Sequence, residues 1–166
     1  MTTGPTRART YSWGDPSESA GAVQTSAGID VLRAIADGSL PGAPIGATIG
    51  MGIESVEEGR VVFTLDPAEH HYNPIGSVHG GVFATLLDSA CGCAVHSLLP
   101  AGVGYTSLDL TVKFLRAMTA DTGPVRCTGT VTHLGGRTAL AEARLVDGRD
   151  RLLATATSSI LVLRPA

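Results

Sequence analysis

The chain has 166 residues, of which 43% are hydrophobic and 16% are charged, and its formal net charge is −3. This length fits one domain with a real hydrophobic core and is short for two ordinary domains. The slight negative charge and the aromatic content of 4% argue against a nucleic-acid-binding surface and against attraction to an anionic membrane.

Residues 1–27 are rich in Gly, Pro, Ser and Thr and contain no apolar run of the kind found in a signal peptide. We therefore expect a flexible, loosely ordered N-terminal extension, followed by a single domain over residues 28–166. The cysteines Cys91, Cys93 and Cys127 do not have the spacing of a disulfide framework. We expect them to be reduced packing residues in a cytoplasmic protein.

The first predicted element is a short helix over residues 28–38, with Gly38 just beyond its end. From residue 45 the pattern becomes strand-like, and Glu58-Gly59 predicts a hairpin turn before a second strand over residues 60–65. Residues 66–77 contain two prolines and predict a structured loop.

Residues 81–99 form a nearly uninterrupted apolar segment that approaches the length of a membrane span. Asp88 lies in its middle, no second span exists, and the flanks have strand patterns. The segment therefore predicts a buried helix that starts near Gly80.

Residues 105–117 alternate in polarity, which predicts a strand with Leu108, Leu110, Val112 and Phe114 on its buried face. Residues 125–133, 138–146 and 152–163 predict three further strands. A helix that is apolar all round must be wrapped, so an antiparallel sheet around it is expected, in an α+β fold. The sheet's long free edge predicts at least a dimer.

Asp88 is the first candidate functional residue. A carboxylate inside an apolar helix loses hydration, and Asp is a poor residue for a helix interior. Perturbed carboxylates concentrate at active sites, which favours an acid or base. A structural Asp that meets a hydroxyl or a backbone amide is the alternative.

His79-Gly80-Gly81 at the helix start is the second candidate. Free N–H groups there can stabilise an oxyanion by roughly 3 to 4 kcal/mol per donor, although a plain glycine-rich helix entry is the alternative. Asp88 follows Gly80 by eight residues, about 12 Å along a straight helix, so the two cannot serve one carbonyl within a chain. Two antiparallel helices in a dimer would bring them together.

Other polar residues have weaker claims. Asn73 can donate and accept near a substrate carbonyl, or Asn73-Pro74 can simply initiate a turn. His79 is better explained as a cap or packing group than as a base. His70-His71 is an adjacent pair without a metal-ligand spacing, so we expect no metal site.

Together, NPIGSVHGGVFATLLDSACG and YTSLDLTVKFLRA resemble the hotdog-fold thioesterases of the PaaI-like, phenylacetate-degradation type, from about residue 45 to residue 163. The resemblance implies an antiparallel β-sheet wrapped around a long central helix, and homodimers, often paired into homotetramers, with active sites between subunits. It also implies hydrolysis of an acyl-CoA to the free acid and CoA, with no cofactor besides the coenzyme A of the substrate.

Residue by residue, the resemblance makes Asp88 the catalytic carboxylate, Gly80 the amide that polarises the carbonyl, and Asn73 the polar loop residue. Thr106 matches a Ser/Thr that positions water or the carboxylate, and it falls on the predicted helix-facing side of its strand. The remaining candidates are substrate or CoA contacts: His79, which would also support the loop, Gly81, Arg116 and Arg137. Solvated surface arginines are the alternative for the last two.

Several alternatives stay open. A non-enzymatic acyl-CoA sensor would carry a DNA-binding module, a hotdog hydratase or dehydratase would use a histidine with an acid in another pattern, and a purely structural subunit is the third. Asp88 could act as general base or as nucleophile. The small residues Ala84, Cys91 and Gly92 share its helical stripe and leave room for an aromatic or an aliphatic acyl group.

Overall fold

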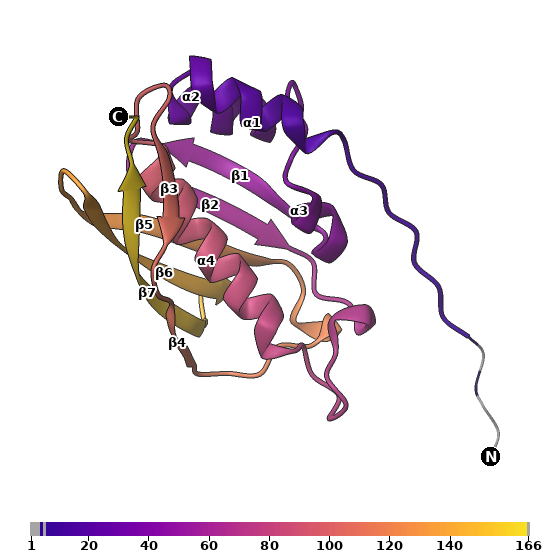
Figure 1. Ribbon diagram of the computed structural model, residues 1–166. Coiled ribbons are helices and arrows are strands. Elements are labelled where there is room, and N and C mark those ends of the chain that lie inside the picture. Colours follow the sequence, from indigo (N-terminus) through magenta and orange to yellow (C-terminus); the bar gives the residue numbers. More distant parts are fainter. Residues whose placement is uncertain (1–3, 5, 166) are drawn as a thin grey trace.

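Seven strands form one antiparallel sheet in the order β1-β2-β5-β6-β7-β3, and β4 also pairs with β7 (Figure 1). The computed structural model describes residue 4 and residues 6–165. The strands are β1 Met51–Glu57, β2 Arg60–Leu65, β3 Gly104–Ser107, β4 Thr111–Phe114, β5 Val125–Leu134, β6 Thr138–Asp147 and β7 Leu152–Leu163. The three C-terminal strands lie where the sequence predicts them.

Helix α4, Gly80–His96, lies against one face of this sheet (Figure 1). Leu86, Leu87 and Ala90 on it are completely buried. On β5, a Cβ atom at Gly129 would stand 2.0 Å from the Ala90 carbonyl oxygen, so this glycine lets the helix approach the sheet closely. The predicted α+β arrangement, an antiparallel sheet around a long apolar helix, is confirmed. Across the described residues, no helix combines the length and hydropathy that a bilayer crossing requires.

The N-terminal region contains a helix that the sequence analysis did not predict. Helix α1, Pro16–Thr25, begins with Pro16 in its first turn, and the Asp15 carboxylate accepts the Ser17 N–H at 2.9 Å as an N-cap. Its Val23 carbonyl accepts the Gly102 N–H at 2.9 Å, which ties it to the segment after α4. Residues 16–25 are therefore not the loosely ordered chain that composition suggested.

Helix α2, Gly28–Ala36, agrees with the predicted helix, and Gly38 has the left-handed φ of 83° expected beyond a helix end. The strand expected from residue 45 is wrong for its first part. Residues Pro44–Ile49 form helix α3, because Pro44 fits a first helical turn and Gly50, with φ 76°, ends the helix. Strand β1 follows immediately.

The strand predicted over residues 105–117 is divided into β3 and β4. Ser107 pairs with Ile160, but Thr111 pairs with Thr157, so one extra residue lies between them on this side of the ladder. The extra residue is accommodated at Asp109, whose carboxylate accepts the Ser159 N–H at 3.0 Å. Such a bulge reverses which alternate residues face the helix.

Short 3₁₀ helices complete the chain: η1 over Glu69–His71 and η2 over Ala120–Thr122. The first lies in the loop between β2 and α4, and the second lies between β4 and β5. The η1 loop leads directly into the start of α4, where the candidate site begins.

Candidate active site

Asn73 organises the loop that precedes α4. Its Oδ1 accepts the N–H groups of Ile75 at 3.0 Å and Ser77 at 3.3 Å, and its Nδ2 donates to the Ser77 hydroxyl at 3.2 Å. This is the turn-forming role that the Asn-Pro pair predicted. The amide nitrogen has two hydrogens, so one of them is left for a ligand.

The start of α4 presents a free backbone donor. His79 is the N-cap, and its Nδ1 accepts the Gly81 N–H at 2.9 Å, so Gly81 is already satisfied. The Gly80 N–H has no acceptor among the described residues. It lies at the positive end of the helix dipole, where a carbonyl oxygen that gains negative charge is stabilised.

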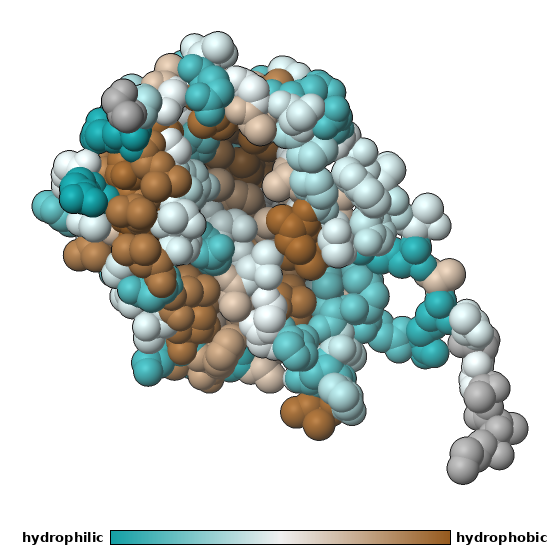
Figure 2. Space-filling model, viewed as in Figure 1, coloured by the Kyte–Doolittle hydropathy of each residue, from teal (hydrophilic) through white to brown (hydrophobic). Residues whose placement is uncertain are grey.

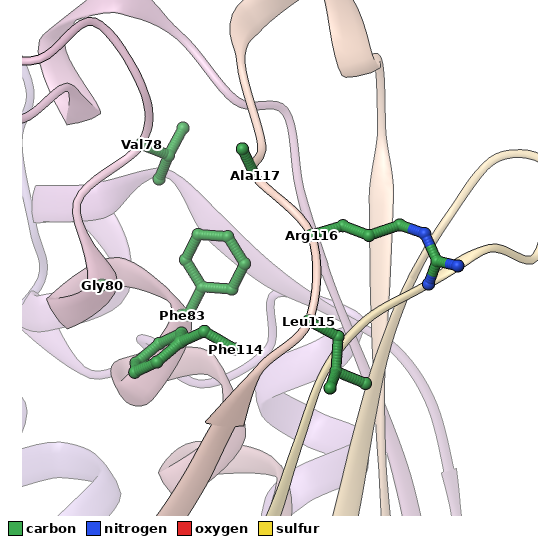
Figure 3. Close-up of a pocket in the computed structure, with 7 residues that line it drawn as sticks. All are labelled: Val78, Gly80, Phe83, Phe114, Leu115, Arg116 and Ala117. Carbon is green, nitrogen blue, oxygen red and sulfur yellow. The ribbon is translucent and has the colours of Figure 1, made fainter.

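A cavity of about 290 Å³ opens beside Gly80. Figure 3 shows the rings of Phe83 and Phe114 next to this glycine, and they meet edge to face with centroids 5.7 Å apart. A Cβ atom at Gly80 would stand 3.3 Å from the Phe114 ring, so a glycine gives the ring its place. The other lining residues are Val78, Leu115, Arg116 and Ala117. Gly80 therefore lines an open pocket in which most of the neighbouring side chains are apolar.

The two candidate arginines are exposed surface residues. The Arg116 side chain is exposed, points away from the phenylalanine pair in Figure 3, and donates to the Leu152 carbonyl at 2.5 Å. Arg137 lies at the turn between β5 and β6, is exposed, and does not line the cavity. Each cation is therefore available only to the outer part of a ligand.

Asp88 lies two turns further along α4 and is half-buried. The Ser107 hydroxyl donates to its Oδ1 at 2.8 Å. Thr106, expected on this side of the strand, is instead exposed on the opposite face, so that prediction is wrong. The bulge at Asp109 reverses the alternation, and Ser107 occupies the place expected for Thr106. An aspartate inside a predicted strand was the available signal, because strands disfavour it.

The room expected beside Asp88 is partly filled by the chain itself. A Cβ atom at Gly92 would stand 2.7 Å from the Tyr105 ring, which occupies the space that the glycine leaves. Cys91 is completely buried. Only Ala84, which is half-buried, remains as an accessible small residue on that stripe.

The nearby thiols are poor nucleophiles. Burial, and to a smaller extent the Asp88 carboxylate, raises the pKa of the Cys91 thiol to about 12. Burial also raises the pKa of the Cys93 thiol to about 11. A thiol in this range stays protonated at neutral pH, and the thiolate is the reactive form. The carboxylate is therefore the better candidate for chemistry on this helix.

No group of three His, Cys, Asp or Glu side chains within the described part of the chain is arranged to hold a metal ion. His71, one of the adjacent histidines, is buried and makes hydrogen bonds to backbone groups. Its partner His70 is exposed.

Gly80 and Asp88 lie on one continuous helix, so they are about 12 Å apart along its axis. A single chain therefore does not bring these two groups together. The stripe that joins them contains Gly81, Ala84 and Thr85, which are small and are half-buried or exposed.

A second uncovered surface lies along the β3–β4 edge of the sheet, where Figure 2 shows a band of hydrophobic residues. Leu108, Phe114 and Leu115 are each more than half exposed, at 58%, 56% and 52%. Exposed apolar side chains beside an unpaired strand edge are typical of an association surface.

Comparison with known proteins gives consistent matches. Residues 75–154 match the family model described as Thioesterase superfamily. A 1,4-dihydroxy-2-naphthoyl-CoA hydrolase of Listeria monocytogenes is 32% identical over 116 residues, which are 69% of this chain and 92% of that protein.

Two solved structures illustrate the similarity of fold. The E. coli PaaI protein from the phenylacetic acid degradation operon matches with a TM-score of 0.67 and 26% identity, over 75% of this chain and 86% of that one. A thioesterase family protein from Silicibacter pomeroyi matches with a TM-score of 0.69 and 28% identity, over 74% of this chain and 91% of that one.

Proposed function

Since the chain belongs to the thioesterase superfamily and is a thioester hydrolase of the hotdog fold, we propose that it hydrolyses acyl-CoA at a site that two subunits share. One observation carries this proposal. Gly80, whose N–H is free, lines a pocket with mainly apolar side chains at the start of α4, while Asp88 is held by Ser107 two turns away on the same helix.

The thioester carbonyl oxygen binds at the Gly80 N–H. The amide and the helix dipole stabilise the negative charge that this oxygen gains when the carbonyl carbon is attacked, which typically contributes a factor of about 10² to 10³ in rate for one donor. The second Nδ2 hydrogen of Asn73, on the loop before the helix, would be a further donor to the substrate.

The partner subunit supplies the carboxylate. Ala84 lies midway between Gly80 and Asp88, so a two-fold axis beside Ala84 brings each Gly80 opposite the Asp88 of the other chain. Small residues on this stripe allow two antiparallel helices to approach closely. The apolar β3–β4 edge would be covered in the same dimer, and two dimers would make the homotetramer.

Asp88 then activates water or attacks directly. As a general base it takes a proton from water while the oxygen attacks the thioester carbon, the C–S bond breaks, and the CoA thiolate leaves and is protonated. As a nucleophile its carboxylate forms a mixed anhydride, releases CoA and is regenerated by water. Ser107 holds the carboxylate in either case.

For the acyl group, an aromatic acid is the first candidate. The edge-to-face pair of Phe83 and Phe114 offers an aromatic wall beside Gly80, and the Listeria relative is named for an aromatic acyl-CoA. A medium aliphatic chain would fill the same apolar walls. The exposed Arg116 and Arg137 would meet CoA phosphates. The reaction needs no cofactor, since coenzyme A is part of the substrate.

The test is a panel of aromatic and aliphatic acyl-CoAs, with release of free thiol as the readout. We expect turnover by the natural chain and a loss of about 10² to 10⁴ in kcat for Asp88→Asn, the range typical of a lost acid or base. Ser89→Ala, on the neighbouring position of the same helix, is the matched control. Full hydrolysis by Asp88→Asn would end the proposal.

A further inference from the structure

The buried imidazole of His71 joins two backbone segments. Its Nδ1 accepts the Ala68 N–H at 3.0 Å, and its Nε2 lies 2.7 Å from the Ile49 carbonyl oxygen. A backbone N–H can only donate, so Nδ1 carries no proton, and Nε2 therefore carries it and donates to Ile49. The side chain is a neutral bridge between the end of α3 and the η1 turn, and His71 is only 5% exposed.

The backbone of His71 continues this bridge to the candidate site. Its carbonyl accepts the His79 N–H at 2.8 Å. His79 in turn caps α4 by accepting the Gly81 N–H on Nδ1. A run of hydrogen bonds thus leads from α3 through His71 and His79 to the first turn of α4, and it satisfies Gly81 while leaving Gly80 free.

The intervening loop is also held by the hydrogen bonds of Asn73 and by the Ala120 N–H, which donates to the Tyr72 hydroxyl at 2.8 Å, but its tip is exposed. Ile75 at its tip is 87% exposed, and Pro74 and Gly76 are exposed as well. Besides the His71 contact, the returning strand is held by the Val78 N–H, which donates to the Met118 carbonyl at 2.8 Å. His71 is thus one of the contacts that set the position of the His79 backbone and, with it, the direction of the Gly80 amide.

We propose that His71 is a positioning residue for the Gly80 amide, a role that rests on the proposed function. The imidazole does not touch the substrate. It fixes the η1 turn, which fixes His79, which fixes the helix entry. Misplacement of a reacting group by about 1 Å can cost a factor of about 10² in rate, so a small shift of this turn is enough to impair catalysis.

The adjacent histidine provides a matched control. His70 is exposed, its ring is tilted by 51° against that of His71 with centroids 4.0 Å apart, and it makes no side-chain hydrogen bond among the described residues. The pair therefore separates the effect of losing a histidine from the effect of losing the bridge.

The experiment compares His71→Ala, His71→Asn, His71→Gln and His70→Ala by kcat, KM and melting temperature. Asn keeps an acceptor near the place of Nδ1, and Gln keeps a donor near the place of Nε2. We expect kcat to fall by about 10- to 100-fold in His71→Ala with KM within a few-fold, partial recovery in Asn or Gln, and no change in His70→Ala.

A spectroscopic readout tests the inference without relying on turnover. The Gly80 amide cross-peak in an NMR spectrum should move in His71→Ala, return toward its natural position in Asn or Gln, and stay in place in His70→Ala. An unmoved Gly80 amide, or a wild-type kcat in His71→Ala, would overturn the positioning role. Absence of hydrolysis by the natural chain with the amide shifted as expected would instead remove the proposed function alone.

Discussion

The Ser107 hydroxyl donates a 2.8 Å hydrogen bond to the Asp88 carboxylate, and this contact joins the edge strand β3 to the middle of α4. The bond depends on the bulge at Asp109. On the N-terminal side of the bulge, Tyr105 and Ser107 point toward the helix, and on its C-terminal side Phe114 does. One extra residue thus places both the hydroxyl at Asp88 and the aromatic ring at Gly80.

The Ser107–Asp88 contact predicts unequal effects for two neighbouring hydroxyls. Ser107→Ala should lower kcat by about tenfold, because a hydrogen bond to a charged group is typically worth about 1.5 to 3 kcal/mol and part of that orients the carboxylate. Thr106→Ala, on the exposed face, should stay within about twofold by the same reasoning. Steady-state kinetics on both variants measure these effects. A larger loss of kcat in Thr106→Ala than in Ser107→Ala would place Thr106, and not Ser107, in the site.

The bulge also shows where pattern reading fails. The buried face expected for Leu108, Leu110, Val112 and Phe114 is wrong in part: Leu110 and Val112 are half-buried, but Leu108 and Phe114 are more than half exposed, and extending the alternation back to Thr106 assumed an unbroken strand. A single extra residue inverts every side chain beyond it, so the strand region was found, but it is divided into β3 and β4, and the hydroxyl that faces Asp88 belongs to Ser107 instead of Thr106. By contrast, Gly80 and Asp88 are at the predicted places on α4, because helix periodicity has no comparable interruption there.

Close packing was the other source of error. Small residues beside Asp88 suggested open space, but the Tyr105 ring fills the space over Gly92. A sequence shows that a side chain is small without showing what occupies the vacancy. The roles of His71 and of α1 were hidden for a similar reason, since both depend on backbone partners that are distant in the chain, at Ile49 and Gly102.

A substitution at Ala84 tests whether activity depends on dimer formation. Ala84→Arg should give a monomer with native circular dichroism and at least a 100-fold lower kcat/KM, because a cation on the stripe between two close helices would be buried without a partner. Analytical ultracentrifugation and kinetics measure both. The control is Ala20→Arg on an exposed position of α1. An active monomer would contradict the shared site.

We expect the Phe114 ring to limit the size of the acyl group that fits beside Gly80. Phe114→Ala should raise kcat/KM for longer or bulkier acyl groups relative to short ones by about 10-fold, the scale on which hydrophobic pockets discriminate. A series of acyl-CoAs of increasing size measures this ratio, with Leu134→Ala as a control on the distant end of β5. A uniform loss across the series would place the acyl group outside this cavity.

The buried carboxylate of Asp147 should make the stability of the fold depend on pH. Burial alone would raise the pKa of this carboxyl, but hydrogen bonds from the Arg151 and Arg149 backbone and from the Arg151 side chain outweigh it, so its pKa is lowered. A lowered folded-state pKa gives stability that is present above the ordinary value of 3.8 and is lost as pH falls through the folded value.

Asp147→Asn should therefore melt at a lower temperature than the natural chain at neutral pH, and the difference should shrink as the solution is acidified below pH 3.8. Thermal melts across this range measure it. Asp150→Asn is the control, because Asn tolerates the left-handed φ of 57° at that exposed position. A difference that is constant with pH would show that charge has no part in the effect.

The shared site can be tested by mixing two inactive variants. Asp88→Asn removes the carboxylate. Gly80→Pro removes the amide hydrogen at a position that suits proline, the first of the helix, and His79, with φ −62° and ψ 139°, already has the extended backbone that proline requires before it. The proline ring also displaces the Phe114 ring, because a Cβ atom at this position would stand 3.3 Å from it.

After the two variants are dissociated and reassociated in equal amounts, half of the dimers should pair one of each chain. Each mixed dimer would have one intact site of two, so the mixture should regain about a quarter of the natural activity. Activity no greater than that of the separate variants would contradict a site built from Gly80 of one chain and Asp88 of the other.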